Sequence, residues 1–201
     1  MDKFSFFFAF YGLILGLAVT ELLSGFARLI QARALKHVGL QTALLALFTF
    51  VVICATWLSA WDTLRAISLD FGGLWAPILL ATFYYLAAAL VFPRENKELT
   101  QLNEYYTERK KFIVGSLLVA ELLFDYTFRH IFIETYTNEP AKFWLWFFPY
   151  NVLIKGSYLA VFFVRNRRAN IIFLSVLIGL VALPYSDNGA VQRAILQHFG
   201  W

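Results

Sequence analysis

Long runs of apolar residues, separated by short polar stretches, dominate the pattern of this chain. A helix needs about 20 consecutive apolar residues to cross the hydrocarbon core of a bilayer. Six segments approach or reach that length: 5–30, 41–64, 74–92, 112–134, 142–164 and 169–185. The pattern predicts an all-α, polytopic integral membrane protein with six transmembrane helices, folded as a single transmembrane domain over residues 1–201.

Basic residues gather in the first, third and fifth connections between these segments. Those connections hold Arg28, Arg33, Lys36, Arg94, Lys97, Arg109, Lys110, Lys111, Arg165, Arg167 and Arg168. The opposite side has only scattered basic residues, which are Lys3, Arg65, Lys142 and Arg193. Because cytoplasmic loops carry an excess of Lys and Arg, both termini are expected outside the membrane.

The two ends of the chain have patterns of their own. Phe4 to Ile30 is unbroken and lacks a cleavage site of small residues, which favours a retained first helix over a signal peptide. Apolar residues recur at helical spacing within 186–201. This segment is expected to form a short amphipathic helix on the outer interface, and the alternative is an irregular tail.

Composition agrees with a membrane location. The chain is 60% hydrophobic and only 15% charged, whereas a soluble domain has roughly 25% charged residues. The net charge of +4 comes from residues at the ends of apolar segments, so nucleic acid is not an expected partner. Cys54 is the single cysteine, which excludes an intrachain disulfide.

The two halves of the chain share a short repeat. Residues 16–23 (GLAVTELL) and 116–123 (SLLVAELL) are identical at five of eight positions, and the third and sixth segments end alike before Pro93 and Pro184. A duplication of three helices gives an inverted repeat, an architecture common in transporters. The alternative is chance similarity between leucine-rich helices.

The fourth and fifth segments contain charged residues deep within apolar surroundings. If these segments form an antiparallel hairpin, reflection of the chain about residue 138 brings Glu121 level with Lys155 and Asp125 level with Asn151. A lysine facing lipid at the midplane costs several kcal/mol, so these residues should face a neighbouring helix. The predicted centre is a Glu121–Lys155 ion pair.

Further polar residues extend this centre into a seam. Arg129 follows Asp125 by one turn, and Tyr158 lies on the same face as Asn151 and Lys155. Glu21, on the first segment, is expected to join the seam, although its position also permits a pair with Arg28 at the cytoplasmic boundary.

Two interpretations of the seam remain open. In the first, Glu121 and Lys155 only lock the hairpin. In the second, Glu21, Glu121 and Asp125 outnumber Lys155, and an acid-rich interior then requires protons or cations. The sequence contains no HExxH motif, nucleophile elbow or phosphate-binding glycine loop, so no catalytic residue, metal site or cofactor is predicted and an enzyme is the weakest interpretation.

The segments 16–25 (GLAVTELLSG) and 85–93 (YLAAALVFP), with Tyr105-Tyr106 and Arg109-Lys110, make the chain similar to a group of uncharacterised bacterial six-helix inner-membrane proteins. The resemblance covers the first two-thirds of the chain. It implies a bacterial inner-membrane location and six helices. No functional residues carry over, because the group has no known activity.

The leading functional prediction is a small transporter or channel for protons, cations or a small polar solute, working as a homo-oligomer in the lipid bilayer. Its binding or proton-coupling residues would be Glu21, Glu121, Asp125, Asn151, Lys155 and Tyr158. The alternative is a non-transporting membrane partner, sensor or scaffold subunit whose buried charges are structural. A water-filled cavity that reaches Glu121 would favour transport, and a dry Glu121–Lys155 pair would favour the alternative.

Overall fold

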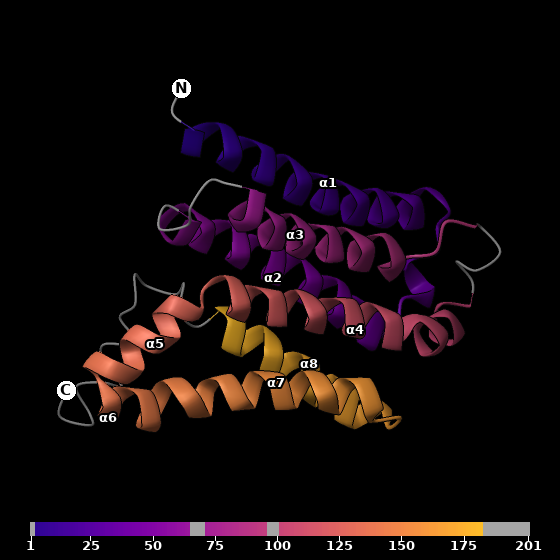
Figure 1. Ribbon diagram of the computed structural model, residues 1–201. Helices are drawn as coiled ribbons and strands as arrows, with labels where there is room; N and C mark the ends of the chain where they lie inside the picture. The colour runs from indigo at the N-terminus through magenta and orange to yellow at the C-terminus, as the bar shows by residue number, and fades with distance from the viewer. Residues whose placement is uncertain (1–2, 65–70, 96–100, 183–201) are drawn as a thin grey trace.

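The structure is a computed structural model that describes residues 3–64, 71–95 and 101–182 (Figure 1). Within these ranges the chain is helical and contains no strand. The elements are α1 (Lys3–Gln31), a 3-10 turn (Leu35–His37), α2 (Leu40–Thr63), α3 (Phe71–Val91), α4 (Leu102–Thr127), α5 (Arg129–Asn138), α6 (Pro140–Lys142), a π-helical turn (Phe143–Phe147), α7 (Phe148–Phe163) and α8 (Arg167–Ala182). The all-α prediction is confirmed.

The helix ends follow local chemistry. After α1 the chain passes through Arg33 in the left-handed region, with φ of 54°, and this residue redirects the backbone into the 3-10 turn. Pro140 begins α6, where a missing N–H costs little. Pro149 follows directly on the π-helical turn Phe143–Phe147 and removes one backbone donor from a continuous helical run. Helix α4 begins well before the apolar segment 112–134, and the break at Phe128 divides that segment between α4 and α5.

Among the described residues, three helices are long and apolar enough to cross a membrane: Phe4–Gln31, Leu40–Trp61 and Leu74–Val91. The other predicted spans fall short for different reasons. Helices α7 and α8 have 16 residues each, and α4 carries Lys110, Lys111, Glu121 and Asp125. The structure therefore supports membrane association through several apolar helices, and the count of six spans stays a prediction.

The long helices run side by side in an antiparallel bundle (Figure 1). Helix α3 packs against α1 on one side and α4 on the other, while α2 packs against α8 and α8 against α7. Small residues lie where these helices meet. Ala18, Ala81, Ala87 and Ala120 are completely buried. Small side chains allow helix backbones to approach closely, as is typical of membrane bundles.

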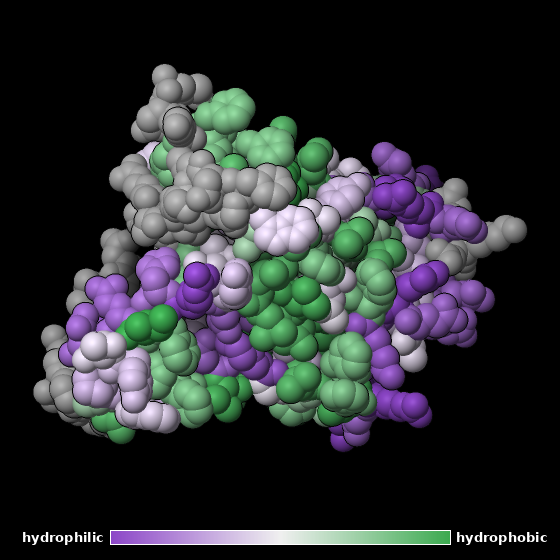
Figure 2. Space-filling view, in the orientation of Figure 1, coloured by the Kyte–Doolittle hydropathy of each residue, from purple (hydrophilic) through white to green (hydrophobic). Residues whose placement is uncertain are grey.

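Large apolar side chains point outward around the bundle. Phe6, Leu145 and Phe163 are each at least 65% exposed. Figure 2 shows apolar surface across the middle of the bundle and hydrophilic surface at both ends, where α1 and α3 finish and α4 begins and at the end that carries α5. Such an apolar surface is suited to lipid rather than to water.

The packing does not reproduce an internal repeat. An inverted duplication would pair α4 with α8 as closely as α1 pairs with α3. Among the described residues α1 packs extensively on α3, whereas α4 packs on α3 and α7 and has no comparable contact with α8. The repeat therefore remains unconfirmed, and the predicted helix at 186–201 lies outside the described residues.

Gly25 allows the end of α3 to approach α1. A Cβ atom at Gly25 would lie 2.7 Å from Cδ2 of Phe92 and 2.8 Å from its Cβ, whereas a Cβ at Gly16 on the same helix would meet nothing within 4 Å. The contact involves the root of the Phe92 side chain, so rotation of the ring alone cannot relieve it.

We expect Gly25→Ala to destabilise the protein by about 1–3 kcal/mol, because the extra methyl group overpacks the α1–α3 contact. The thermal unfolding midpoint in detergent measures the effect. Gly16→Ala is the matched control on α1 and should leave the midpoint unchanged or raise it. Equal midpoints for both variants would contradict the close approach at Gly25.

Candidate functional site

Lys155 on α7 is the centre of a polar cluster between α4 and α7. Its Nζ lies 2.8 Å from Oδ2 of Asp125 on α4. It also donates a hydrogen bond to Oδ1 of Asn151, at 2.9 Å, one turn away on its own helix. Asn151 in turn donates through Nδ2 to the carbonyl of Phe147, at 2.9 Å. Asp125 and Asn151 thus hold the ammonium, and the Phe147 carbonyl orients Asn151.

The partner of Lys155 differs from the prediction. No ion pair within 4.0 Å joins Lys155 to Glu121 among the described residues, because Asp125 takes that place. The midpoint of 125 and 155 is residue 140, so the hairpin is displaced from the assumed centre at 138. The cause is local: α4 ends at Thr127 and the π-helical turn Phe143–Phe147 precedes α7. A π turn contains an extra residue and shifts the register of everything that follows it.

A cavity of about 890 Å³ opens beside this cluster. Its polar lining comes from four helices and consists of Thr56, Ser59, Glu121, Asp125, Arg129 and Asn151. Aromatic side chains make up much of the remainder, namely Phe124, Tyr126, Phe128, Phe132, Phe147 and Tyr150. The cavity occupies the half of the bundle where α2 and α8 end and α7 begins.

Glu121 lies at the deep end of the cavity. The lining residues on α4 and α5 run from Glu121 to Phe132. Glu121 is the member farthest along the chain from the exposed Phe132. Its carboxylate has no ion pair within the described part of the chain, although Lys155 and Asp125 are near enough to act on it electrostatically. The structure therefore separates two carboxylates, one paired and one unpaired.

Beyond Glu121 the interior is closed by buried aromatic residues. Tyr158 is completely buried, and its ring packs edge-on against Phe48 at 5.4 Å. Its hydroxyl has no hydrogen-bond partner among the residues that the structure describes. The nearby Thr56 and Tyr84 share a hydrogen bond of 2.9 Å. Tyr158 therefore belongs to the core behind the cavity and does not line it.

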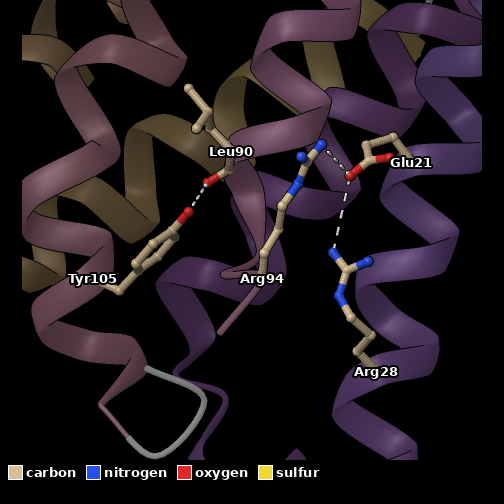
Figure 3. Close-up of polar contacts among 5 residues, drawn as sticks. All are labelled: Glu21, Arg28, Leu90, Arg94 and Tyr105. Atoms are coloured by element: carbon tan, nitrogen blue, oxygen red, sulfur yellow. Dashed lines mark hydrogen bonds and ion pairs between the residues drawn. The ribbon is translucent and has the colours of Figure 1, made fainter. Parts of the chain in front are cut away.

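Glu21 does not join this seam. It lies on α1, outside the cavity, and forms ion pairs with Arg94 at 3.1 Å and Arg28 at 4.0 Å (Figure 3). The predicted Glu21–Arg28 pair is confirmed, whereas the expected contact with the α4–α7 seam is not. The reason is packing: α1 contacts α2 and α3, and these helices separate it from α7. Nearby, the Tyr105 hydroxyl donates to the Leu90 carbonyl (Figure 3).

A second polar cluster, which the sequence analysis did not predict, lies at the opposite end of α4. Lys110 is only 6% exposed and donates to the carbonyl of Val164 at the end of α7 and to Oδ1 of Asn170. Asn170 donates to the same carbonyl at 3.1 Å. The signal in the sequence is helical spacing, since Lys110 shares its face with the buried Ile113 and Leu117.

Burial lowers the pKa of Lys110 below its ordinary value of 10.5, and the neighbouring Lys111 and Arg165 lower it further. Burial likewise raises the pKa of Tyr106 to about 12. The two shifts have the same origin, because an apolar environment disfavours the charged form of each group.

The chain is thus a helical protein with several helices apolar enough to cross a membrane and a largely aromatic cavity that contains a few charged groups. No protein-family model, no curated protein and no solved structure matches the sequence. Within the described ranges no three His, Cys, Asp or Glu side chains group together as metal ligands. The chemistry of the site therefore follows from its own residues.

We expect the Asp125–Lys155 pair to contribute about 1 kcal/mol of coupling energy, a typical value for polar contacts between membrane helices. A double-mutant cycle of Asp125→Ala and Lys155→Met, followed by chemical unfolding in detergent, measures it. The exposed Glu139–Lys142 pair, at 2.9 Å, is the matched control and should give coupling near zero. Additive effects of the two seam substitutions would argue against the pair.

We expect the stabilising effect of Lys110 to increase with pH. Its folded-state pKa is lowered, so just below 10.5 the unfolded chain binds more protons than the folded one, and stability rises with pH through that range. The unfolding midpoint of the wild type minus that of Lys110→Met should therefore grow from about pH 8 to about pH 10. The exposed Lys36 supplies the control, Lys36→Met, and the same pH trend in both variants would contradict the assignment.

Proposed function

We propose that this protein is a small transporter or channel of the bacterial inner membrane that moves protons, cations or a small polar solute. The observation that carries the proposal is the unpaired Glu121 carboxylate at the deep end of an open cavity. A buried carboxylate in a membrane is costly unless it binds a proton or a cation. A residue that only locked the hairpin would instead be paired and sealed.

Lys155 decides which carboxylate is available. The Lys155 ammonium is held by Asp125 and Asn151, so the Asp125 carboxylate already has a partner. Glu121, one turn away, is then the group that exchanges a proton or binds the transported cation. Loss of the Lys155 charge would leave both carboxylates competing for the same proton or cation, so Lys155→Met would uncouple or abolish transport.

The proposed orientation has six spans, with both termini outside. It is supported by the basic residues near the ends of α1 and α3 and the start of α4, because cytoplasmic loops carry an excess of Lys and Arg. The cavity would then open outward, and Arg28, Arg94 and Lys110 would lie on the cytoplasmic side. Homo-oligomer formation remains a prediction.

One observation favours a second candidate, a membrane sensor or scaffold subunit that binds a ligand without moving it. The interior beyond Glu121 is closed, because Phe48, Leu117 and Tyr158 are at most 1% exposed. A transporter needs a second arrangement in which this layer opens, whereas a sensor does not. Flux measurements separate the two candidates.

We expect Glu121→Gln to abolish flux in liposomes that contain the purified protein, because an amide can neither exchange a proton nor neutralise a cation. A pH-sensitive dye inside the liposomes reports proton movement, and imposed sodium and potassium gradients report cation movement. Glu134→Gln, at an exposed carboxylate on α5, is the control and should keep wild-type flux. Wild-type flux in Glu121→Gln, or none in the wild type, would remove the transport proposal.

A further inference from the structure

Three charged side chains line the cavity, and two of them already have partners. Asp125 is paired with Lys155 at 2.8 Å. Arg129 lies over the ring of Tyr126, with 4.8 Å from its guanidinium carbon to the ring centroid, and donates to the carbonyl of the same residue at 3.0 Å. Of the three, Glu121 alone has no ion pair, hydrogen bond or ring contact in the described part of the chain, so its carboxylate is the charge most available to a ligand.

The walls around this charge are largely aromatic. Phe124 and Phe128 meet edge-to-face with their centroids 4.4 Å apart, and Phe132 and Phe147 do so at 5.5 Å. Edge-to-face pairs leave ring faces turned in different directions. The face of an aromatic ring attracts cations and also packs well against apolar groups.

The size of the cavity restricts the ligand further. A volume of about 890 Å³ falls in the range of pockets for organic ligands, roughly 300–1,000 Å³. A water molecule fills about 30 Å³ of liquid, and a bare inorganic cation would leave most of the cavity and all of its aromatic wall unused. A larger cation with an apolar body would fill both.

We infer that the cavity binds an organic ammonium cation, with its charge against Glu121 and its apolar body among the aromatic rings. This inference rests on the cavity that the proposed function uses and names its ligand class, but it does not depend on transport. Recognition requires only binding from the open side.

The test is calorimetric titration of the purified protein in detergent with three soluble probes, each corrected for titration into empty micelles. They are 2-phenylethylammonium, the uncharged 2-phenylethanol, and ethylammonium, which lacks the aromatic body. We expect 2-phenylethylammonium to bind at one saturable site at least about tenfold more tightly than either other probe. Equal affinity for the alcohol, or no saturable binding of the aromatic ammonium, overturns the inference.

Two variants locate the binding site. Glu121→Gln should weaken the binding of 2-phenylethylammonium at least about tenfold, and Phe132→Leu about threefold, because each removes one element of recognition. Glu134→Gln and the outward-facing Phe163→Leu are matched controls and should bind like the wild type. Wild-type affinity in both cavity variants would also overturn the inference.

Binding and flux fail independently. A protein that binds 2-phenylethylammonium through Glu121 but moves nothing across liposomes keeps this inference and loses the transport proposal. A protein that conducts protons through Glu121 but ignores all three probes keeps the transport proposal and loses this inference.

Discussion

The contact between α4 and α7 depends on the neutralisation of one ammonium group. In the proposed six-span arrangement this group lies in the hydrocarbon region, where no water solvates a lysine and its charge must be met by protein groups. Lys155 is met by Asp125 across the interface and by Asn151 on its own helix. The Phe147 carbonyl, in the π-helical turn, orients Asn151. Charge neutralisation is therefore coupled to an irregularity of the backbone, and the pairing of α4 with α7 depends on both.

This pairing leaves Glu121 in different surroundings from Asp125, although the two are one turn apart on α4. Asp125 belongs to an ion pair, and Glu121 faces a cavity without one. Two neighbouring carboxylates with unlike environments are a common device for giving one of them a fixed charge and the other an exchangeable one. At the opposite end of α4, Lys110 is buried against carbonyl oxygens, and no carboxylate of the described residues pairs with it.

The sequence predicted the features that depend on local pattern. The apolar segments 5–30, 41–64 and 74–92 correspond to α1, α2 and α3, and the Glu21–Arg28 pair follows from helical spacing. The sequence-based prediction failed where the helix register depends on irregular backbone, because no residue type predicts a π turn. The hairpin centre lies at residue 140 and not at 138, so Lys155 pairs with Asp125 and not with Glu121. The contact between Arg94 and Glu21 could not be predicted for another reason. The two residues are 73 positions apart, and their contact depends on how α3 ends beside α1. The burial of Lys110 could have been predicted, since its spacing places it on the buried face of α4.

The irregular elements also limit how the bundle can move. In the proposed transport cycle the layer of Phe48 and Tyr158 must open while the outer cavity closes. A regular helix resists such bending, and helices bend most readily at prolines and at π turns. Both features occur together at the start of α7, where Phe143–Phe147 precedes Pro149, and α4 is interrupted at Phe128 on the facing side. The proposed cycle therefore places a hinge at the same end of the two helices that carry Glu121 and Lys155, beside the cavity. A rotation of α7 about this hinge would displace Lys155 and Tyr158 together, which links the charge that fixes Asp125 to the layer that closes the core.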